Sequence, residues 1–276
     1  MAARKLSPSA QIDGWFRISG VPVLLYHGIS DNNRKSVPVH EKRFCVSAEQ
    51  FREQLRVIKS LGCAIITLDQ LVRRSFDPRN PAVVITFDDG LASDHAISFP
   101  LLREAKAVAH FFINTANVGA PGHMNWAQIA KLHCAGMHIG SHGHEHADLS
   151  RLQNATLVHQ LVHSRKILEG HLQDRISWFA APYGLVSRSL FSAVTQSGYQ
   201  GICTSHCWPA KPHSIRVPRI ALYEDTTIEE FRSLLLGKPS PYLVRNLRAA
   251  GKYIPKQLLL RLRPSMLGVN VPQEEQ

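Results

Sequence analysis

The sequence lacks both a run of apolar residues long enough to cross a membrane and a clear disulfide framework. A transmembrane helix needs ~20 consecutive apolar residues, and no segment approaches that length. The N-terminal Met1–Gln11 is polar and basic, and Val21–Tyr26 is too short for the apolar core of a signal peptide.

The cysteines are odd in number and mostly lie inside apolar runs: Cys45, Cys63, Cys134, Cys203 and Cys207. This usage favours a reducing compartment, so we expect a cytoplasmic protein, or one on the cytoplasmic face of a membrane.

Acidic residues are also absent from Arg232–Gln273, although this stretch carries eight Lys or Arg residues. Within it, apolar and basic residues alternate at helical spacing: Leu243, Val244, Leu247 and Ala250 with Arg245, Arg248 and Lys252. A second basic segment, Lys256–Arg263, follows. A basic amphipathic tail suits anionic lipid headgroups, so peripheral membrane contact is one interpretation. The alternative is a helix packed on the domain with its charges in water. The net charge of +11 comes with no nucleic-acid motif, so we do not expect nucleic acid as a partner.

The rest of the chain has the pattern of one large α/β domain. Its 276 residues, with 44% hydrophobic and 19% charged residues, provide for a substantial core. Short β-branched runs alternate with helical periodicity, which predicts βα units and a parallel sheet. We expect strands at 21–27, 63–68, 82–88, 107–114, 137–142, 178–183, 199–204 and 217–222. We expect helices from Ser47, with Gln50 as its capping-box partner, to Leu61, and at 95–105, 126–135, 155–172, 187–197 and 228–235.

About eight such strands predict a distorted (β/α)7-8 barrel. The organisation we expect is an N-terminal extension at residues 1–20, one α/β domain at 21–236 and the basic tail at 237–276.

Two segments end apolar runs with side chains that bind metals. Residues 83–90 read Val-Val-Ile-Thr-Phe-Asp-Asp-Gly, so two adjacent carboxylates, Asp88 and Asp89, stand at the lip of a buried strand. His142 and His146 follow a second predicted strand, four residues apart, and can close on one ion. Three protein ligands with an open position are typical of a hydrolytic metal site. The pattern predicts one Asp and two His as ligands, with the second Asp left as a base.

Two further residues lie at the same predicted edge of the sheet, because reactive groups of parallel α/β folds gather where strands end. His27 follows the first strand; a lone His there is more often structural, but its place at the edge favours a role. Tyr183 lies in the turn Pro182-Tyr183-Gly184. Such a turn is either purely structural or aims a backbone N–H at a developing oxyanion, with the aromatic ring beside a sugar.

These motifs resemble the polysaccharide deacetylase superfamily, also called the NodB-homology domain or carbohydrate esterase family 4. Residues 86–90 match its first motif, 142–146 its His-rich motif, with Gly143 in place of the usual hydroxyl residue, and 179–184 its third. The resemblance covers roughly residues 21–235 and implies a NodB-type barrel. It also implies that Asp88 is the general base, that Asp89, His142 and His146 bind a divalent metal, with zinc expected, and that the Tyr183 region forms the oxyanion site.

The sequence departs from the family pattern at two positions. Many members have a catalytic His near the C-terminus of the domain, but no His follows His213. The poly-β-1,6-N-acetylglucosamine deacetylases take their acid from the N-terminal strand instead, and His27 fits that role. Ala180 stands where many members carry an Arg that orients the base. Arg219, just before a predicted strand, is the candidate to replace it.

The function implied is hydrolytic removal of an acetyl group from an N-acetylated sugar, with an Asp base, a His acid and a metal-bound water. With no export signal expected, a nucleotide- or lipid-linked oligosaccharide intermediate of glycan assembly is the expected substrate, and the basic tail suits a lipid-linked one. Two alternatives stay open: amide hydrolysis on a non-sugar C–N bond, because a fold does not determine its substrate, and a glycan-binding pseudoenzyme. Retention of the base and all three ligands argues against the pseudoenzyme, whereas the missing Arg at position 180 and the displaced acid argue for it.

Overall fold

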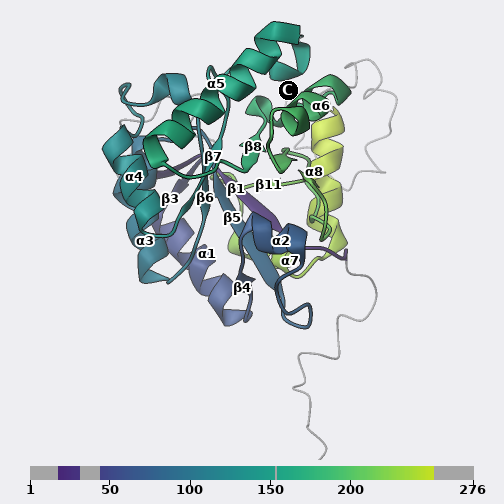
Figure 1. Ribbon diagram of the computed structural model, residues 1–276. Coiled ribbons are helices and arrows are strands. Elements are labelled where there is room, and N and C mark those ends of the chain that lie inside the picture. Colours follow the sequence, from purple (N-terminus) through teal and green to yellow (C-terminus); the bar gives the residue numbers. More distant parts are fainter. Residues whose placement is uncertain (1–17, 32–43, 153, 252–276) are drawn as a thin grey trace, which may run out of the picture.

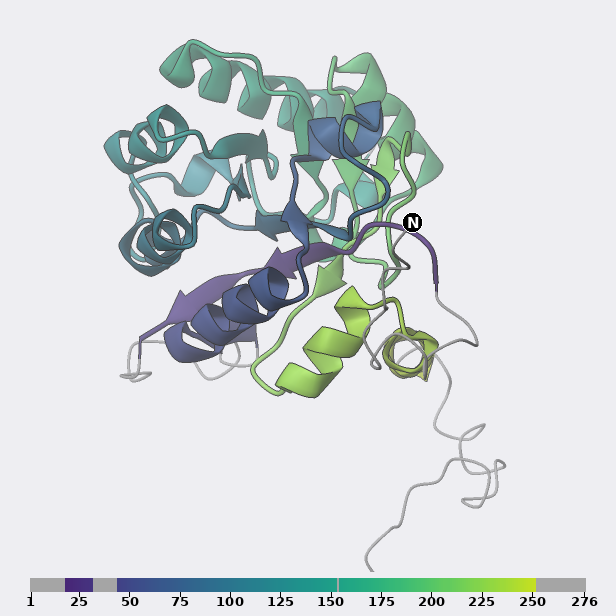
Figure 2. The same ribbon diagram turned by 90° about the horizontal axis from the view of Figure 1, so that it is seen from below.

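The computed structural model describes residues 18–31, 44–152 and 154–251 (Figure 1). Most of the N-terminal extension and the second basic segment, Lys256–Arg263, therefore lie outside the described residues. A curved parallel sheet occupies the centre, and helices surround it (Figures 1 and 2).

Nine strands form the sheet in the described chain: eight follow the order β10-β9-β8-β7-β6-β5-β1-β11, and β4 pairs with β5 outside this path. Every strand pairing in it is parallel. The strands are β1 (Val23–Tyr26), β4 (Ala64–Ile65), β5 (Ala82–Phe87), β6 (His110–Ile113), β7 (His138–Ser141), β8 (Trp178–Ala180), β9 (Gly201–Cys203), β10 (Arg216–Val217) and β11 (Ile220–Ala221). A separate pair is formed by β2 (Gly28–Ser30) and β3 (Cys45–Ser47). The predicted distorted barrel is confirmed, since the sheet curls without closing between β10 and β11 in the described chain.

The helices follow the amphipathic segments of the sequence. They are α1 (Ala48–Ser60), α2 (Leu68–Arg73), α3 (Phe99–Glu104), α4 (Trp126–Cys134), α5 (Asn154–Leu172), α6 (Arg188–Gln196), α7 (Ile228–Leu235) and α8 (Pro239–Gly251). In the described part of the chain, no helix combines the length and the apolar character needed to span a bilayer.

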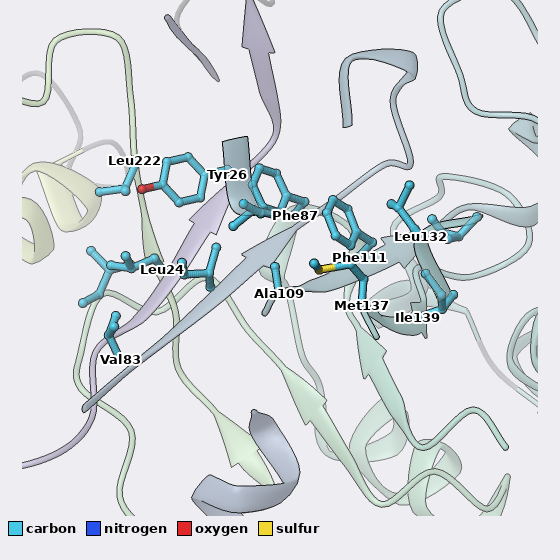
Figure 3. Close-up of a cluster of buried hydrophobic side chains, with 14 of the residues drawn as sticks. Leu24, Tyr26, Val83, Phe87, Ala109, Phe111, Leu132, Met137, Ile139 and Leu222 are labelled. Atoms are coloured by element: carbon cyan, nitrogen blue, oxygen red, sulfur yellow. The ribbon is translucent and has the colours of Figure 1, made fainter. Parts of the chain in front are cut away.

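A row of aromatic rings runs through the hydrophobic core along three neighbouring strands (Figure 3). Tyr26, Phe87 and Phe111 lie on the neighbouring strands β1, β5 and β6. The ring centroids of Tyr26 and Phe87 are 5.2 Å apart, those of Phe87 and Phe111 4.8 Å, and both pairs are stacked. Stacked aromatic pairs add about 0.5–1.5 kcal/mol each beyond area burial, so this row stiffens the strands that end at the acidic and imidazole side chains.

Several predicted elements differ in detail from those observed. The strand expected at 178–183 ends at Ala180, because Pro182–Gly184 forms a 3₁₀ turn. The strand expected at 217–222 is divided into β10 and β11 by Pro218 and Arg219. The capping box is only half formed: Ser47 accepts from the Gln50 backbone N–H, but the Gln50 side chain donates to carbonyls of Glu224 and Thr226.

Helix α8 covers part of the barrel, beside α7 (Figures 1 and 2). Its Tyr242 is fully buried, stacks edge-on against Trp208 and donates its hydroxyl to the Leu234 carbonyl at 2.8 Å. The first part of the basic tail is therefore a helix packed on the domain, as the second interpretation of the sequence expected. Not all of its charges lie in water, however, because Arg245 turns inward and pairs with Glu230 at 2.7 Å. Its outer face carries the exposed Leu243 and Leu247.

Candidate active site

The polar residues singled out in the sequence meet at the carboxyl edge of the sheet. Asp88 and Asp89 follow β5, His142 follows β7, and His27 follows β1. The backbone turns sharply at Asp89, whose φ is 73°. A short polar side chain tolerates this left-handed conformation better than most. As a result, the two neighbouring carboxylates contact different partners.

Asp88 is held by Arg219 through two parallel hydrogen bonds. Nη1 donates to Oδ1 and Nη2 to Oδ2, both at 2.7 Å, and neither side chain is more than 3% exposed. Burial raises the pKa of Asp88, but the charge of Arg219, helped by that of His142, outweighs it and lowers the pKa overall. Asp88 is thus a carboxylate, oriented in one plane.

Arg219 reaches Asp88 from the linker between β10 and β11, across the interior of the barrel. Its Nε donates to the carbonyl of Thr204, at the end of β9, at 3.1 Å. Its Nη1 also lies 3.3 Å from the hydroxyl of Thr86, and its guanidinium carbon is 5.3 Å from the ring centroid of Phe112. A fully buried guanidinium with these partners is fixed in place.

Asp89, His142 and His146 form the second half of the site. The Nε2 atoms of both imidazoles lie 3.4 Å from the same atom, Asp89 Oδ1. That oxygen is buried and has no hydrogen-bond partner among the described residues. A buried acceptor without a donor is costly, and a cation bound between this oxygen and the two imidazoles would relieve that cost. Among the described residues, these three form the one group with metal-ligand spacing.

The tautomer of His142 suits metal binding. Its Nδ1 lies 2.9 Å from the carbonyl oxygen of Ala180, which can only accept, so Nδ1 carries the proton and donates it. Nε2 is left with its lone pair toward Asp89. A backbone carbonyl that orients a ligating imidazole in this way is typical of metal sites.

The charges at the site also favour a cation. Burial raises the pKa of Asp89, but the close approach and the charge of the His142 imidazole outweigh it and lower the pKa overall. Burial lowers the pKa of His142, but Asp88 and Asp89 outweigh it and raise the pKa. The two carboxylates therefore attract positive charge to this point, and a bound metal would displace the proton from His142.

His27 lies close to both carboxylates. Burial lowers the pKa of His27, and the charges of Asp88 and Asp89 counteract this only in part. Its Nδ1 is buried and has no hydrogen-bond partner in the described chain, and its ring centroid is 5.2 Å from that of Phe44. The imidazole is therefore confined beside the carboxylates without being tied to a structural partner.

Tyr183 forms an outer wall of the site. Its side chain is 61% exposed, its ring centroid lies 4.7 Å from that of His146, and its backbone adopts φ 59°. Gly184, at φ 69°, follows. A Cβ at Gly184 would lie 2.3 Å from Ser205, so only glycine fits there. The turn thus holds a strained, exposed tyrosine at the mouth of the site.

Two residues near the site were not predicted. Phe44 covers one side of His27, and nothing in its sequence surroundings marks it. Asp94, at the start of the π-helical turn Asp94–Ser98, is fully buried, and its Oδ1 has no partner among the described residues. Burial raises the pKa of Asp94 well above its usual range, and Asp89 adds to the effect. The signal that could have found Asp94 is its place in the sequence, shortly after Asp88 and Asp89.

Comparison with known proteins agrees with this geometry. Residues 76–202, which include Asp88, Asp89, His142, His146 and the Tyr183 turn, match the family model of polysaccharide deacetylases. Residues 76–202 belong to a polysaccharide deacetylase domain. The curled parallel sheet and its helices are the NodB-type (β/α) barrel of that family.

The domain is similar to several known proteins. It is 24% identical over 188 residues to YxkH of Bacillus subtilis, and the match spans 67% of this chain and 64% of YxkH. It is 25% identical over 202 residues to a poly-β-1,6-N-acetyl-D-glucosamine N-deacetylase of Staphylococcus aureus, over 67% of this chain and 70% of that protein. Among solved structures, it superposes on the deacetylase PplD of Streptococcus pyogenes with a TM-score of 0.71 at 19% identity, over 80% of this chain and all of PplD. The TM-score to IcaB from Ammonifex degensii is 0.67 at 22% identity, over 79% and 97% of the two chains.

Proposed function

We propose that the protein is a metal-dependent N-deacetylase that hydrolyses the acetamido group of an N-acetylated glycan. One observation carries this proposal: a single oxygen of Asp89 lies 3.4 Å from two imidazole nitrogens, while the adjacent Asp88 is held apart by Arg219. One carboxylate is thereby assigned to a cation and its neighbour is kept as a base. The family membership of the domain supports the same reaction.

The donor set and its spacing fit zinc. Zinc takes His nitrogen and carboxylate oxygen ligands at about 2.0–2.2 Å in tetrahedral geometry, which implies ligand–ligand distances of about 3.3–3.5 Å. Both nitrogen–oxygen distances measured here, 3.4 Å, fall in that range. A divalent cation held by Asp89, His142 and His146 supplies polarisation of the acetyl carbonyl and lowers the pKa of a water from about 16 towards about 7.

Asp88 acts as the general base in this proposal. Its low pKa keeps it ionised, and each oxygen that accepts from Arg219 retains a lone pair for a water proton. Arg219 is a positioning residue, because it fixes the plane of the Asp88 carboxylate. It takes the place of the Arg that many family members carry at the position of Ala180. A base within hydrogen-bond reach of the attacking water contributes about 10²–10⁴-fold.

His27 acts as the general acid. An amine leaves a tetrahedral intermediate slowly unless it is protonated, and the imidazole of His27, once protonated beside the two carboxylates, can deliver that proton. The Tyr183–Gly184 turn lies beside His146, where its ring can cover a sugar and its backbone can approach the oxyanion.

The substrate that the relatives favour is a polymer or oligomer of N-acetylglucosamine, because one of them is a poly-β-1,6-N-acetyl-D-glucosamine N-deacetylase. A lipid-linked intermediate on the cytoplasmic face of a membrane remains part of the proposal. Binding to anionic vesicles, compared between the full chain and a chain ending after Gly251, tests it. Truncation near Gly237 would instead remove the buried Tyr242 and confuse loss of binding with loss of folding.

Two neighbouring substitutions test the assignment of the carboxylates. Asp88→Asn is expected to retain one zinc per chain and lose acetate release from N-acetylglucosamine oligomers by about 10²-fold or more. Asp89→Asn and His142→Ala are expected to lose the zinc itself. Metal content by mass spectrometry and acetate release are measured on the same samples. Near-normal turnover in Asp88→Asn, or full zinc content in Asp89→Asn, would contradict the proposed roles.

A further inference from the structure

A cavity of about 190 Å³ lies next to the candidate active site, between the segment after β9 and helix α8. Its walls include Ser205 and Cys207 after β9, Tyr223 after β11, and Asn246 and Arg248 on α8. It therefore lies where β10 and β11 fail to pair and the barrel stays open. Its main walls come from residues 205–249, outside the 76–202 segment that matches the family model.

Two contacts connect this cavity with the active site. On one side, Tyr223 lies 5.8 Å from Phe44, and Phe44 lies 5.2 Å from His27, between ring centroids. On the other side, Ser205 packs directly against Gly184, next to Tyr183. The cavity thus adjoins the active site in two places, near His27 and near Tyr183.

The lining of the cavity suits a neutral, hydroxyl-rich ring. Arg245 and Glu230 pair with each other at 2.7 Å, and Arg248 and Asp225 add one charge of each sign. Formal charges therefore cancel, which disfavours an anion such as a phosphate group. The remaining lining includes the Ser205 hydroxyl, the Asn246 amide and the Tyr223 ring, groups that can bind sugar hydroxyls and cover an apolar sugar face.

These lining groups are held in position before any ligand binds. Asn246 donates through Nδ2 to the carbonyls of Cys207 and Tyr242, at 2.8 and 2.9 Å. Arg245 donates to the Ala221 carbonyl and to the Thr226 hydroxyl, and its guanidinium carbon lies 5.7 Å from the Tyr223 ring centroid. Fixed groups lose little freedom on binding, which favours recognition of one geometry.

We infer that this cavity, the α8 cavity, is a subsite for a neighbouring sugar of the glycan whose acetylated ring lies at the metal site. The enzyme consequently acts on oligosaccharides in preference to a single sugar. A cavity of this volume is smaller than sites for drug-sized ligands and admits about one ring. This inference rests on the proposed deacetylase function.

The test is the dependence of kcat/KM on chain length. With the full chain loaded with zinc, β-1,6-linked N-acetylglucosamine monomer, dimer, trimer and tetramer are compared by acetate release. The wild type is expected to gain about tenfold or more between monomer and tetramer. In Tyr223→Ala, and in Ala249→Trp, which fills the cavity without removing a contact, that gain should fall by about tenfold, the effect of one well-buried contact.

Leu247→Ala is the matched control, because Leu247 is on the same helix but exposed on its outer face. It should keep the full gain with chain length. A wild type with equal kcat/KM on monomer and tetramer, or an Ala249→Trp variant with the full gain, would overturn the subsite. A chromogenic acetyl ester without a sugar separates this failure from failure of the proposed function: zinc-dependent ester hydrolysis that Asp88→Asn abolishes shows that the catalytic site works, whatever the α8 cavity does.

Discussion

Arg219 binds both carboxylate oxygens of Asp88, each at 2.7 Å, although the two residues are 131 positions apart in the chain. The pair lies in the interior of the barrel with almost no exposure to solvent. A buried bidentate pair fixes the plane of the carboxylate as well as its charge. It therefore determines which of two adjacent Asp residues can turn toward the imidazoles.

Replacing Arg219 should separate positioning from metal binding. Arg219→Lys keeps the charge but cannot form the fork, so we expect kcat to fall by about 10²-fold with zinc content unchanged. Because Arg219 lowers the pKa of Asp88, the variant should also need a higher pH to ionise the base, and the acidic limb of kcat/KM should move upward. Arg165→Lys, in a remote ion pair with Glu169, is the control. An unshifted limb would show that Asp88 is not the group that titrates there.

Arg219→Met should be far more damaging to stability than Arg219→Lys. It leaves the buried Asp88 carboxylate without its partner, which costs about 3–5 kcal/mol. Urea unfolding measures the difference. If Asp88→Asn is added to Arg219→Met, much of the loss should be recovered, because the unpaired charge is gone. A double variant as unstable as Arg219→Met would show that packing of the Arg219 side chain, and not its charge, stabilises this region.

His27→Gln should discriminate between amide and ester substrates. An amine leaving group requires a proton whereas a phenolate does not, so the loss of an acid affects the amide reaction far more. We expect deacetylation of the glycan to fall by about 10²-fold or more and hydrolysis of a chromogenic acetyl ester to change little. Zinc content, measured in parallel, should be unchanged. Equal losses on both substrates would assign His27 to substrate placement instead of proton transfer.

Gly184→Ala should destabilise the protein more than a second glycine substitution of similar backbone strain. Gly62 has nearly the same φ, 65° against 69°, but a Cβ added there would meet no atom within 4 Å, whereas one added at Gly184 would lie 2.3 Å from Ser205. Gly62→Ala is therefore expected to lose about 1 kcal/mol from backbone strain alone. Gly184→Ala should lose more, and should also weaken glycan turnover because the Tyr183 turn shifts. Equal unfolding free energies would mean that the Ser205 loop adapts freely.

The stability of the protein should depend on pH through His110, a core residue remote from the proposed chemistry. His110 is buried, and its Nε2 accepts from the Leu68 N–H at 2.9 Å, which requires the neutral ring. Burial, with a smaller effect of His138, holds the pKa of His110 well below its usual value of about 6.5. Below that pH the unfolded chain binds a proton that the folded protein does not, so stability falls as the pH decreases.

His110→Gln removes this dependence while keeping an acceptor. The wild type should lose up to about 1.4 kcal/mol per pH unit more than the variant below about pH 6.5. Urea unfolding with the metal chelated measures both, and the exposed His159→Gln serves as the control. Parallel curves for wild type and His110→Gln would show that His110 is protonated in the folded state.

Much of the fold could be predicted because local pattern and tertiary structure agree. Strand β5 is six residues long and buried throughout, as its apolar sequence predicts. Short elements were less predictable: β2, β3 and α2 have no periodic signal, and they form because the chain packs on neighbouring elements. The interruption between β10 and β11 depends on Arg219 turning into the barrel, where its partners come from β5 and β9.

The order of residues along the chain already contains the reactive groups: two adjacent carboxylates after one strand and two imidazoles after another, all of which a parallel sheet must bring to one edge. How these groups divide between metal binding and base depends on contacts made only in the folded domain. Arg219, from the far end of the domain, binds Asp88 and leaves Asp89 to the imidazoles, and Phe44 and Tyr223 extend the site toward α8. The reason is physical: strand order follows from local patterns, whereas a long side chain crossing a buried interior finds its partners only after the barrel has formed.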